Sequence, residues 1–179
     1  MTATPPGRRR FLQSAGAVLR LLPLGGAWAR TPQRRSLSFV HTHTGERLST
    51  VYFEDGQYRT GELERINQLL RDCRTGDVHT IDTGVLDILA DLRVLADRDE
   101  PYEVISGYRS PQTNAALRRH SHGVAEHSLH LEGRAIDVRL PGFATHRLRE
   151  LALAMSRGGV GFYPQLDFVH LDNGRVRYW

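Results

Sequence analysis

The sequence SLHLEGRAID occupies residues 128–137, and its second half predicts a short β-strand over 134–140. Alternate residues of a strand face opposite sides, so Asp137 faces away from the core that its apolar neighbours enter. Gly133 permits a tight turn directly before the strand. Such a turn can bring His130 back over the face that carries Asp137. We therefore expect these two side chains to point into one cleft.

An imidazole and a carboxylate of this kind suit a metal. A catalytic zinc takes three protein ligands and a water, with His and Asp among its usual ligands. His170 is the candidate third ligand, because it lies on the polar face of a strand whose other residues are apolar. Spacing alone has little specificity, since the chain has nine histidines and chance pairs are common. Ordinary surface or core histidines therefore stay open as the alternative.

The residues that follow His170 predict a β-hairpin. Asp172-Asn173-Gly174-Arg175 contains the Asn-Gly pair that favours a two-residue turn between antiparallel strands. Pairing outward from this turn sets Leu171 opposite Val176 and His170 opposite Arg177. We expect Trp179 to pack on the same hairpin.

Hydrophobic periodicity and turn residues predict the rest of the fold. The expected strands cover 37–41, 48–53 and 102–106, and the expected helices start at Thr60, cover 82–96, start at 110–111 and cover 145–157. Thr60 is the expected cap of the first helix, and Gly158-Gly159 is the expected stop of the last. The second helix has a broad apolar stripe that includes Val94 and Leu95. Strands at both ends with helices between them indicate an α+β domain, not a doubly wound parallel sheet.

Composition and charge exclude several classes of protein. The chain has 179 residues, enough for one domain, and a net charge of +4. Four arginines and no acid precede residue 30, whereas the remainder carries 20 arginines and 20 acids. The basic balance therefore belongs to the N-terminus and does not indicate nucleic-acid binding. The single cysteine, Cys73, excludes an intramolecular disulfide framework and a cysteine-rich zinc module.

The first 29 residues have the features of an export signal. Arg8-Arg9 with Phe11-Leu12 behind the pair resembles a twin-arginine signal, and Ala27-Trp28-Ala29 fits a signal-peptidase site. We expect export by the twin-arginine machinery, cleavage after Ala29 and no membrane span after processing. A retained anchor is the alternative. The expected domains are a signal peptide over 1–29 and a catalytic domain over 30–179.

Several motifs together carry a resemblance to a known family. They are Ser-x-His-x-x-Gly-x-Ala-x-Asp over 128–137, Asp-x-x-His over 167–170, VISGYRSPQTN over 104–114, GGVGFY over 158–163 and FVHLDNGRVRYW over 168–179. In these the chain resembles the murein endopeptidase K-like (YcbK-like) bacterial zinc peptidases. That family belongs to the hedgehog/DD-peptidase superfamily, which includes VanX-type D-Ala-D-Ala dipeptidases. The resemblance extends over about the whole chain after the leader.

The resemblance implies a role for each matching residue. His130, Asp137 and His170 match the zinc ligands, and Asp167 matches the general base three positions before the last ligand. Arg109 matches an arginine that stabilises the substrate carbonyl or its oxyanion, and Ser128 matches a residue that contacts substrate or supports the ligands. Positions 167 and 170 would face opposite sides of a regular strand. We therefore expect a bend, or a strand that starts at Phe168, to swing Asp167 into the cleft.

The resemblance also implies a fold and a function. The fold would be hedgehog/DD-peptidase-like, with a central, mainly antiparallel sheet flanked by helices. The function would be zinc-dependent hydrolysis of cross-links between peptidoglycan stem peptides in the periplasm or cell envelope. Two alternatives stay open: a D,D- or L,D-carboxypeptidase or dipeptidase that acts on stem-peptide ends, and a non-catalytic, zinc-stabilised wall-binding domain. Asp167 and Arg109 argue against the second, because a structural zinc needs neither.

The remaining polar candidates have weaker signals. His41 and His43 share a strand face and could bind metal, but we expect them to support the fold. The loop histidines at 120, 122 and 127 could contact substrate. Glu126 and Glu132 are rival bases that no motif supports.

Overall fold

The computed structural model describes residues 1–2, 34–120 and 123–179, and the elements below all lie within Thr31–Trp179. Of the expected export signal over 1–29, only residues 1–2 are described. Arg8, Arg9 and the cleavage position after Ala29 lie outside the described residues, as does His122. None of the described helices is both long and apolar enough to cross a lipid bilayer.

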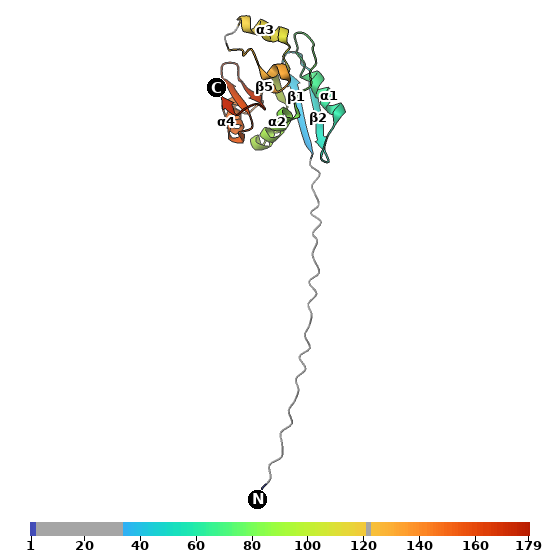
Figure 1. The fold of residues 1–179 in the computed structure, drawn as a ribbon, viewed down its shortest axis with the longest axis vertical. Coiled ribbons are helices and arrows are strands. Elements are labelled where there is room, and N and C mark those ends of the chain that lie inside the picture. Colours follow the sequence, from blue (N-terminus) through green and yellow to red (C-terminus); the bar gives the residue numbers. More distant parts are fainter. Residues whose placement is uncertain (3–33, 121–122) are drawn as a thin grey trace. The chain divides into compact units, whose positions relative to one another are not determined.

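The described part of the chain forms one eight-stranded sheet with the order β3-β2-β1-β4-β5-β7-β6-β8 (Figure 1). The strands are β1 (Arg35–His41), β2 (Arg47–Glu54), β3 (Gln57–Tyr58), β4 (Tyr102–Ser106), β5 (Ala135–Arg139), β6 (Gly159–Tyr163), β7 (Phe168–Asp172) and β8 (Arg177–Tyr178). β1 pairs with β4 in parallel, as β6 does with β8, and the other neighbours are antiparallel. The sheet is mixed, and the expected α+β class is confirmed.

Four α-helices and one 3₁₀-helix accompany the sheet in the described residues: α1 (Thr60–Leu69), α2 (Thr83–Ala96), α3 (Pro111–His120), η1 (Leu129–Glu132) and α4 (Thr145–Met155). Helix α1 packs on β2, α2 packs on β1 and α4, and α4 packs on β6 and β7 (Figure 1). Ile136 and Val138 of β5 and Val169 and Leu171 of β7 enter the core with these helices. The alternate residues of both strands are thereby presented on the opposite face.

The helix ends follow from local capping, with three corrections to the sequence predictions. Asp82 caps α2 by accepting a hydrogen bond from the Gly84 amide at 2.7 Å. Thr60 does not cap α1, because Arg59 occupies the cap position without a side-chain bond. Helix α4 ends at Met155, where Ser156 with a φ of 51° forms the C-cap, before the glycine pair is reached. At the end of α2, Val94 and Leu95 are 78% and 53% exposed, so the buried stripe is narrower than expected.

The expected C-terminal hairpin is wrong. Both edges of β7 are already taken, by β5 on one side and β6 on the other, so the returning chain cannot pair with it. The chain instead crosses to the outer edge of β6, where Tyr178 lies beside Val160 in parallel register. The Asn-Gly segment still turns, with the Asp172 carboxylate accepting from the Gly174 amide at 2.8 Å. Val176 is therefore largely exposed and does not face Leu171.

Candidate active site

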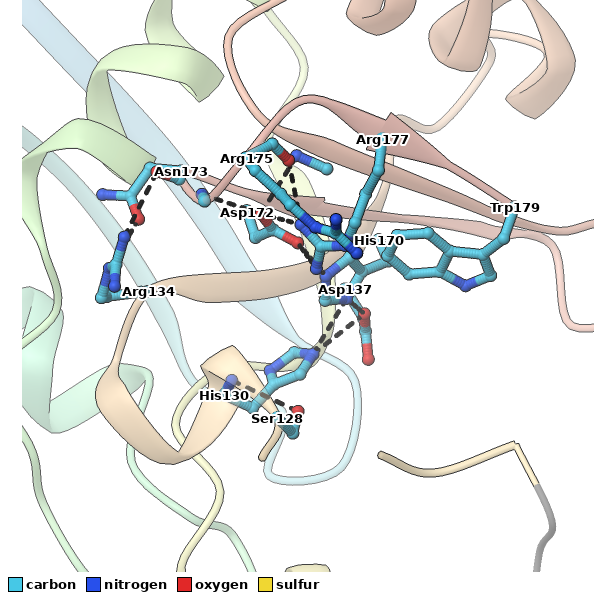
Figure 2. A network of polar contacts seen from close by, with 12 residues as sticks. Ser128, His130, Arg134, Asp137, His170, Asp172, Asn173, Arg175, Arg177 and Trp179 are labelled. Carbon is cyan, nitrogen blue, oxygen red and sulfur yellow. Dashed lines mark hydrogen bonds and ion pairs between the residues drawn. The ribbon is translucent and has the colours of Figure 1, made fainter. Parts of the chain in front are cut away.

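Three buried polar side chains meet on the face of the sheet opposite the helical core. Asp137 of β5 and His170 of β7 are register partners, and His130 reaches them from η1. The Asp137 Oδ1 atom is 2.9 Å from His170 Nδ1 and 3.2 Å from His130 Nε2. The two imidazole nitrogens are 3.2 Å apart (Figure 2). Among the described residues this is the one group of at least three such side chains with a spacing that could hold a metal ion.

The backbone around His130 is shaped to deliver it. Ser128 starts η1, and its Oγ atom accepts from the His130 amide at 3.4 Å. Gly133 ends η1 with a φ of 65°, and a Cβ there would lie 2.1 Å from the Thr80 carbonyl oxygen. A left-handed backbone and this close approach both require glycine. The turn expected at Gly133 is therefore present, and it returns His130 over Asp137.

Each imidazole has one nitrogen held away from the cluster. His130 Nδ1 is 2.7 Å from the Gly107 carbonyl oxygen, and His170 Nε2 is 3.0 Å from Asp172 Oδ2. A carbonyl and a carboxylate only accept hydrogen bonds, so neutral rings with a proton on each of these two nitrogens satisfy both contacts. The lone pairs of His130 Nε2 and His170 Nδ1 then face each other and Asp137. This donor set fits a divalent cation such as zinc.

The charges in the cluster are strongly coupled. Burial raises the pKa of Asp137, but the neighbouring His130 and His170 outweigh it and hold that pKa well below its usual value. Burial lowers the pKa of His130. Burial also acts to lower the pKa of His170, yet its bonds to Asp137 and Asp172 leave that pKa raised. Asp137 is therefore an ionised ligand candidate throughout the neutral range.

Arg109 stands beside the cluster, as the resemblance implies. Its Nη2 atom is 3.6 Å from Asp137 Oδ2, and only 12% of its side chain is exposed. The Nε atom of Arg109 is buried without a hydrogen-bond partner. Two backbone contacts tie its loop to η1: the Arg109 amide donates to the His130 carbonyl at 3.1 Å, and His130 Nδ1 lies on Gly107. The candidate ligand His130 and the Arg109 guanidinium are thus fixed relative to each other.

A cavity of about 560 Å³ opens over the cluster. Besides His130, Asp137 and His170, its wall includes Arg109 and Ser128, together with residues that the sequence did not single out for the site: Arg74, Tyr163, Arg177 and Trp179. His43 and His127 also line it. Asp137 is the single carboxylate among the described lining residues. Among the charged side chains of the wall, three arginines (Arg74, Arg109 and Arg177) therefore face one carboxylate.

Asp167 does not join this group. The strand does start at Phe168, and Asp167 has the expected bend with a φ of 52°. The bend turns its carboxylate to the hydroxyl of Thr145 at the start of α4 and to Arg139, whose Nη1 is 3.9 Å away. The Asp167 side chain is 64% exposed and does not line the cavity. The expectation that it swings into the cleft is wrong, because the left-handed backbone directs it toward α4.

The other candidates have separate partners. His41 is buried, and its Nδ1 atom accepts from the amides of His43 and Thr44, which agrees with a role in the fold. Glu126 pairs with Arg118 and Glu132 with Arg134, and neither acid lines the cavity.

Asp172 is the residue near the cluster that sequence reasoning missed. It was interpreted only as a turn residue, whereas its carboxylate holds His170. Burial raises the pKa of Asp172, but the bonds from His170 and Arg177 keep that pKa far below its usual value. The signal was available, because residues 170 and 172 share one face of a strand.

Comparison with known proteins supplies the class. The model of the family described as "Peptidoglycan L,D-endopeptidase MepK" matches residues 29–179. The protein of that name from Escherichia coli (strain K12) is 40% identical over 175 residues, which is 96% of each chain. A "Probable peptidoglycan L,D-endopeptidase MepK" from Haemophilus influenzae is 37% identical over 183 residues, covering 100% of this chain and 98% of the relative. The chain is therefore a peptidase. It belongs to the MepK family of peptidoglycan L,D-endopeptidases.

Proposed function

We propose that this chain is an exported, zinc-dependent endopeptidase that hydrolyses peptide cross-links in peptidoglycan, with a hedgehog/DD-peptidase fold. One observation carries the proposal. His130, Asp137 and His170 converge in a cavity with both imidazoles oriented so that a lone pair faces the common centre. The substrate is inferred from the family and from the names of its curated members.

His130 Nε2, Asp137 and His170 Nδ1 would hold the zinc. Two imidazoles and one carboxylate are a ligand set of catalytic zinc sites, which keep a further position for water. When bound, the ion supplies an activated water at neutral pH and polarises the scissile carbonyl. The protein residues around the cluster then carry the remaining tasks of binding, orientation and proton transfer.

Arg109 would stabilise the negative charge that develops on the carbonyl oxygen. Its guanidinium lines the cavity beside the ligands and is held in place by its loop. A fixed cation in a partly dry site stabilises such a charge without reorganising. Ser128 lines the same wall and also caps η1, so it can contact substrate while it orients His130.

The attacking water must lose a proton to a group near the cavity. His127 lines the cavity, and its ring has no hydrogen-bond partner among the described residues. A neutral imidazole with a free ring nitrogen can accept a proton directly or through one water. We assign this role to His127 in preference to Asp167, whose carboxylate is directed at Thr145.

The charge of the cavity suits an acidic peptide. Arg74 and Arg109 lie in the wall, and among the described lining residues only Asp137 opposes them. Peptidoglycan stem peptides carry free carboxylates. Electrostatic attraction would therefore favour this substrate over neutral peptides.

The proposal places the enzyme in the periplasm or cell envelope. Arg8-Arg9 with Phe11-Leu12 supports delivery by the twin-arginine route, which exports folded proteins. Peptidoglycan lies in the same compartment, so the leader and the substrate class agree.

Mass spectrometry of muropeptides tests the proposal. We expect zinc-loaded protein to convert cross-linked stem-peptide dimers into monomers and His170→Ala to leave them intact. Loss of terminal residues without dimer cleavage would instead identify a carboxypeptidase. Binding to sacculi without any new product would identify a wall-binding domain.

A further inference from the structure

We propose that Asp172 is the positioning residue that sets the tautomer of His170 and thereby the affinity of the site for its metal. The inference rests on the proposed zinc site. Asp172 lies at the end of β7, two residues after His170 on the same strand face, and its side chain is fully buried. It does not line the cavity and so acts through His170.

The Asp172 carboxylate is enclosed by donors on both of its oxygens. Oδ2 accepts from His170 Nε2 at 3.0 Å and from Arg177 Nη2 at 2.7 Å. Oδ1 accepts from the amides of Gly159 at 3.0 Å and Gly174 at 2.8 Å, and from Arg177 Nη1 at 3.0 Å (Figure 2). With the guanidinium held by two parallel bonds, the carboxylate has little freedom to rotate.

This arrangement determines where His170 carries its proton. A carboxylate can only accept, so Asp172 favours the neutral ring that carries its proton on Nε2 and leaves Nδ1 free for a cation shared with Asp137. Nδ1 then presents a lone pair toward Asp137 and His130. The opposite tautomer would place the Nε2 lone pair against Asp172 and a proton on the nitrogen that has to bind the metal. Carboxylates behind a ligating histidine act in this way at metal sites.

Glycines on β6, the strand next to β7, leave space for the hydrogen-bond network of Asp172. A Cβ on Gly159 would lie 2.4 Å from Asp172 Oδ2 and 2.6 Å from Arg177 Nη1. A Cβ on Gly161 would lie 2.7 Å from the Trp179 ring. The Arg177 Cζ atom in turn lies 5.0 Å from the centroid of the Trp179 ring, and this centroid is 5.1 Å from that of the His170 ring. The two glycines of β6 therefore make room for the groups that surround His170 and Asp172.

Asp172→Asn is the sharpest test, because it keeps the shape of the side chain and replaces one acceptor oxygen by an NH₂ donor. The asparagine side chain can be oriented in two ways. If its NH₂ group takes the place of Oδ1, it faces three donors. If its NH₂ group takes the place of Oδ2, it faces only two. The second orientation is therefore favoured, and it points an N–H at His170 Nε2. That nitrogen must then accept, which moves the ring proton to Nδ1.

We expect Asp172→Asn to bind zinc about 10- to 100-fold more weakly than wild type in a chelator competition. The ¹⁵N spectrum of the metal-free protein at high pH, where the rings are neutral, should change the His170 signals from the Nε2–H to the Nδ1–H tautomer. Excess zinc should restore most of kcat, because Asp172 does not touch the substrate.

Asp87→Asn is the matched control. The Asp87 carboxylate also has several donors, from Tyr52, Tyr58 and Arg35, but Asp87 lies on α2 and these donors lie on β2, β3 and β1. We expect this variant to lose thermal stability while its zinc affinity and its His170 spectrum stay at wild-type values.

The possible results separate the two proposals. Folded Asp172→Asn with wild-type zinc affinity and an unchanged tautomer would overturn the positioning role and leave the metal site intact. If Asp172→Asn does not fold, Asp172→Ala removes the acceptor for His170 Nε2 without adding a donor, and unchanged zinc affinity in that variant would equally reject the proposal. Wild-type protein that binds no zinc would instead overturn the proposed function.

Discussion

His170 and Asp137 are direct partners on neighbouring antiparallel strands, with His170 Nδ1 2.9 Å from Asp137 Oδ1. One register between β7 and β5 therefore delivers two of the three candidate ligands. If β7 slipped by one residue, His170 would turn into the apolar core and Val169 or Leu171 would face the cavity beside Asp137. The pairing of two central strands is thus a condition for the site as well as for the fold.

Arg109→Gln should separate catalysis from metal binding. The glutamine removes the fixed charge beside the ligands, so we expect kcat/KM on a stem-peptide dimer to fall by about 10²- to 10³-fold. Zinc content should stay at the wild-type level, because Arg109 is not a ligand candidate. Arg65→Gln on the exposed face of α1 is the control and should be fully active. Loss of zinc from the Arg109 variant would contradict the assigned role.

Asp167→Ala should have a small effect on turnover. Its carboxylate bonds to Thr145 and lies outside the cavity, so we expect kcat to fall less than about tenfold and zinc to be retained. His127→Ala, measured in the same assay, should lower kcat by about 10²-fold or more. The reverse order of the two variants would restore Asp167 as the base and remove His127 from that role.

Arg74→Gln should act on substrate recognition. The Arg74 side chain lines the cavity and has no hydrogen bond or ion pair among the described residues. We expect KM to rise by about tenfold, equivalent to about 1.4 kcal/mol, on dimers with free carboxylates. Dimers whose carboxylates are amidated should give the same KM with both enzymes. An equal rise on both substrates would argue that Arg74 shapes the wall without pairing to a carboxylate.

Asp72 should make the stability of the fold fall in acid. Burial raises the pKa of this carboxyl, but hydrogen bonds from Thr113, Ser110 and the backbone amide of Arg74 outweigh it and lower the pKa to about 2. A depressed folded-state pKa stabilises the protein above the unfolded value near 3.8, and the contribution is lost as the pH falls toward 2.

We expect this contribution to be about 1 to 2 kcal/mol. Urea denaturation of wild type and Asp72→Asn between pH 2 and 7 measures it as the difference between the two curves. That difference should shrink below pH 4, and a constant difference would show that the carboxyl titrates normally.

Replacement of Arg8 and Arg9 by lysine should block export. The paired arginines are the part of the leader that resembles the twin-arginine signal. We expect the double variant to accumulate in the cytoplasm of a host with that pathway, as seen by fractionation and immunoblotting. Arg10→Lys is the control, because this residue lies outside the pair. Normal export of the double variant would indicate another route.

The sequence predicted those features of the site that depend on strand periodicity and local turns. Asp137 and His170 were placed on the correct face because alternating apolar neighbours determine which side a strand buries. Gly133 was identified as a turn because glycine permits a tight turn, and the structure gives it a left-handed φ of 65°. Both signals are local, and neither depends on which strands become neighbours.

The wrong predictions concern contacts between segments that lie apart in the sequence. Asn173-Gly174 predicted a hairpin, but β6 had already occupied the edge of β7, and local sequence cannot reveal that. Asp167 was expected in the cleft because the motif places it there, whereas Thr145 of α4 attracts its carboxylate. The Asp172 network was missed because two of its donors, Gly159 and Arg177, come from separate strands.

The reciprocal backbone contacts between the Arg109 loop and η1 have a further consequence. Since the Arg109 amide bonds to His130 and the His130 ring bonds to Gly107, neither loop can shift without carrying the other. Arg109 and the candidate metal ligand His130 are thus held in place before any peptide binds, which lowers the reorganisation that catalysis by these groups would need. Substitutions in these two loops should accordingly behave as one energetic unit, with combined effects well short of the sum of the separate ones.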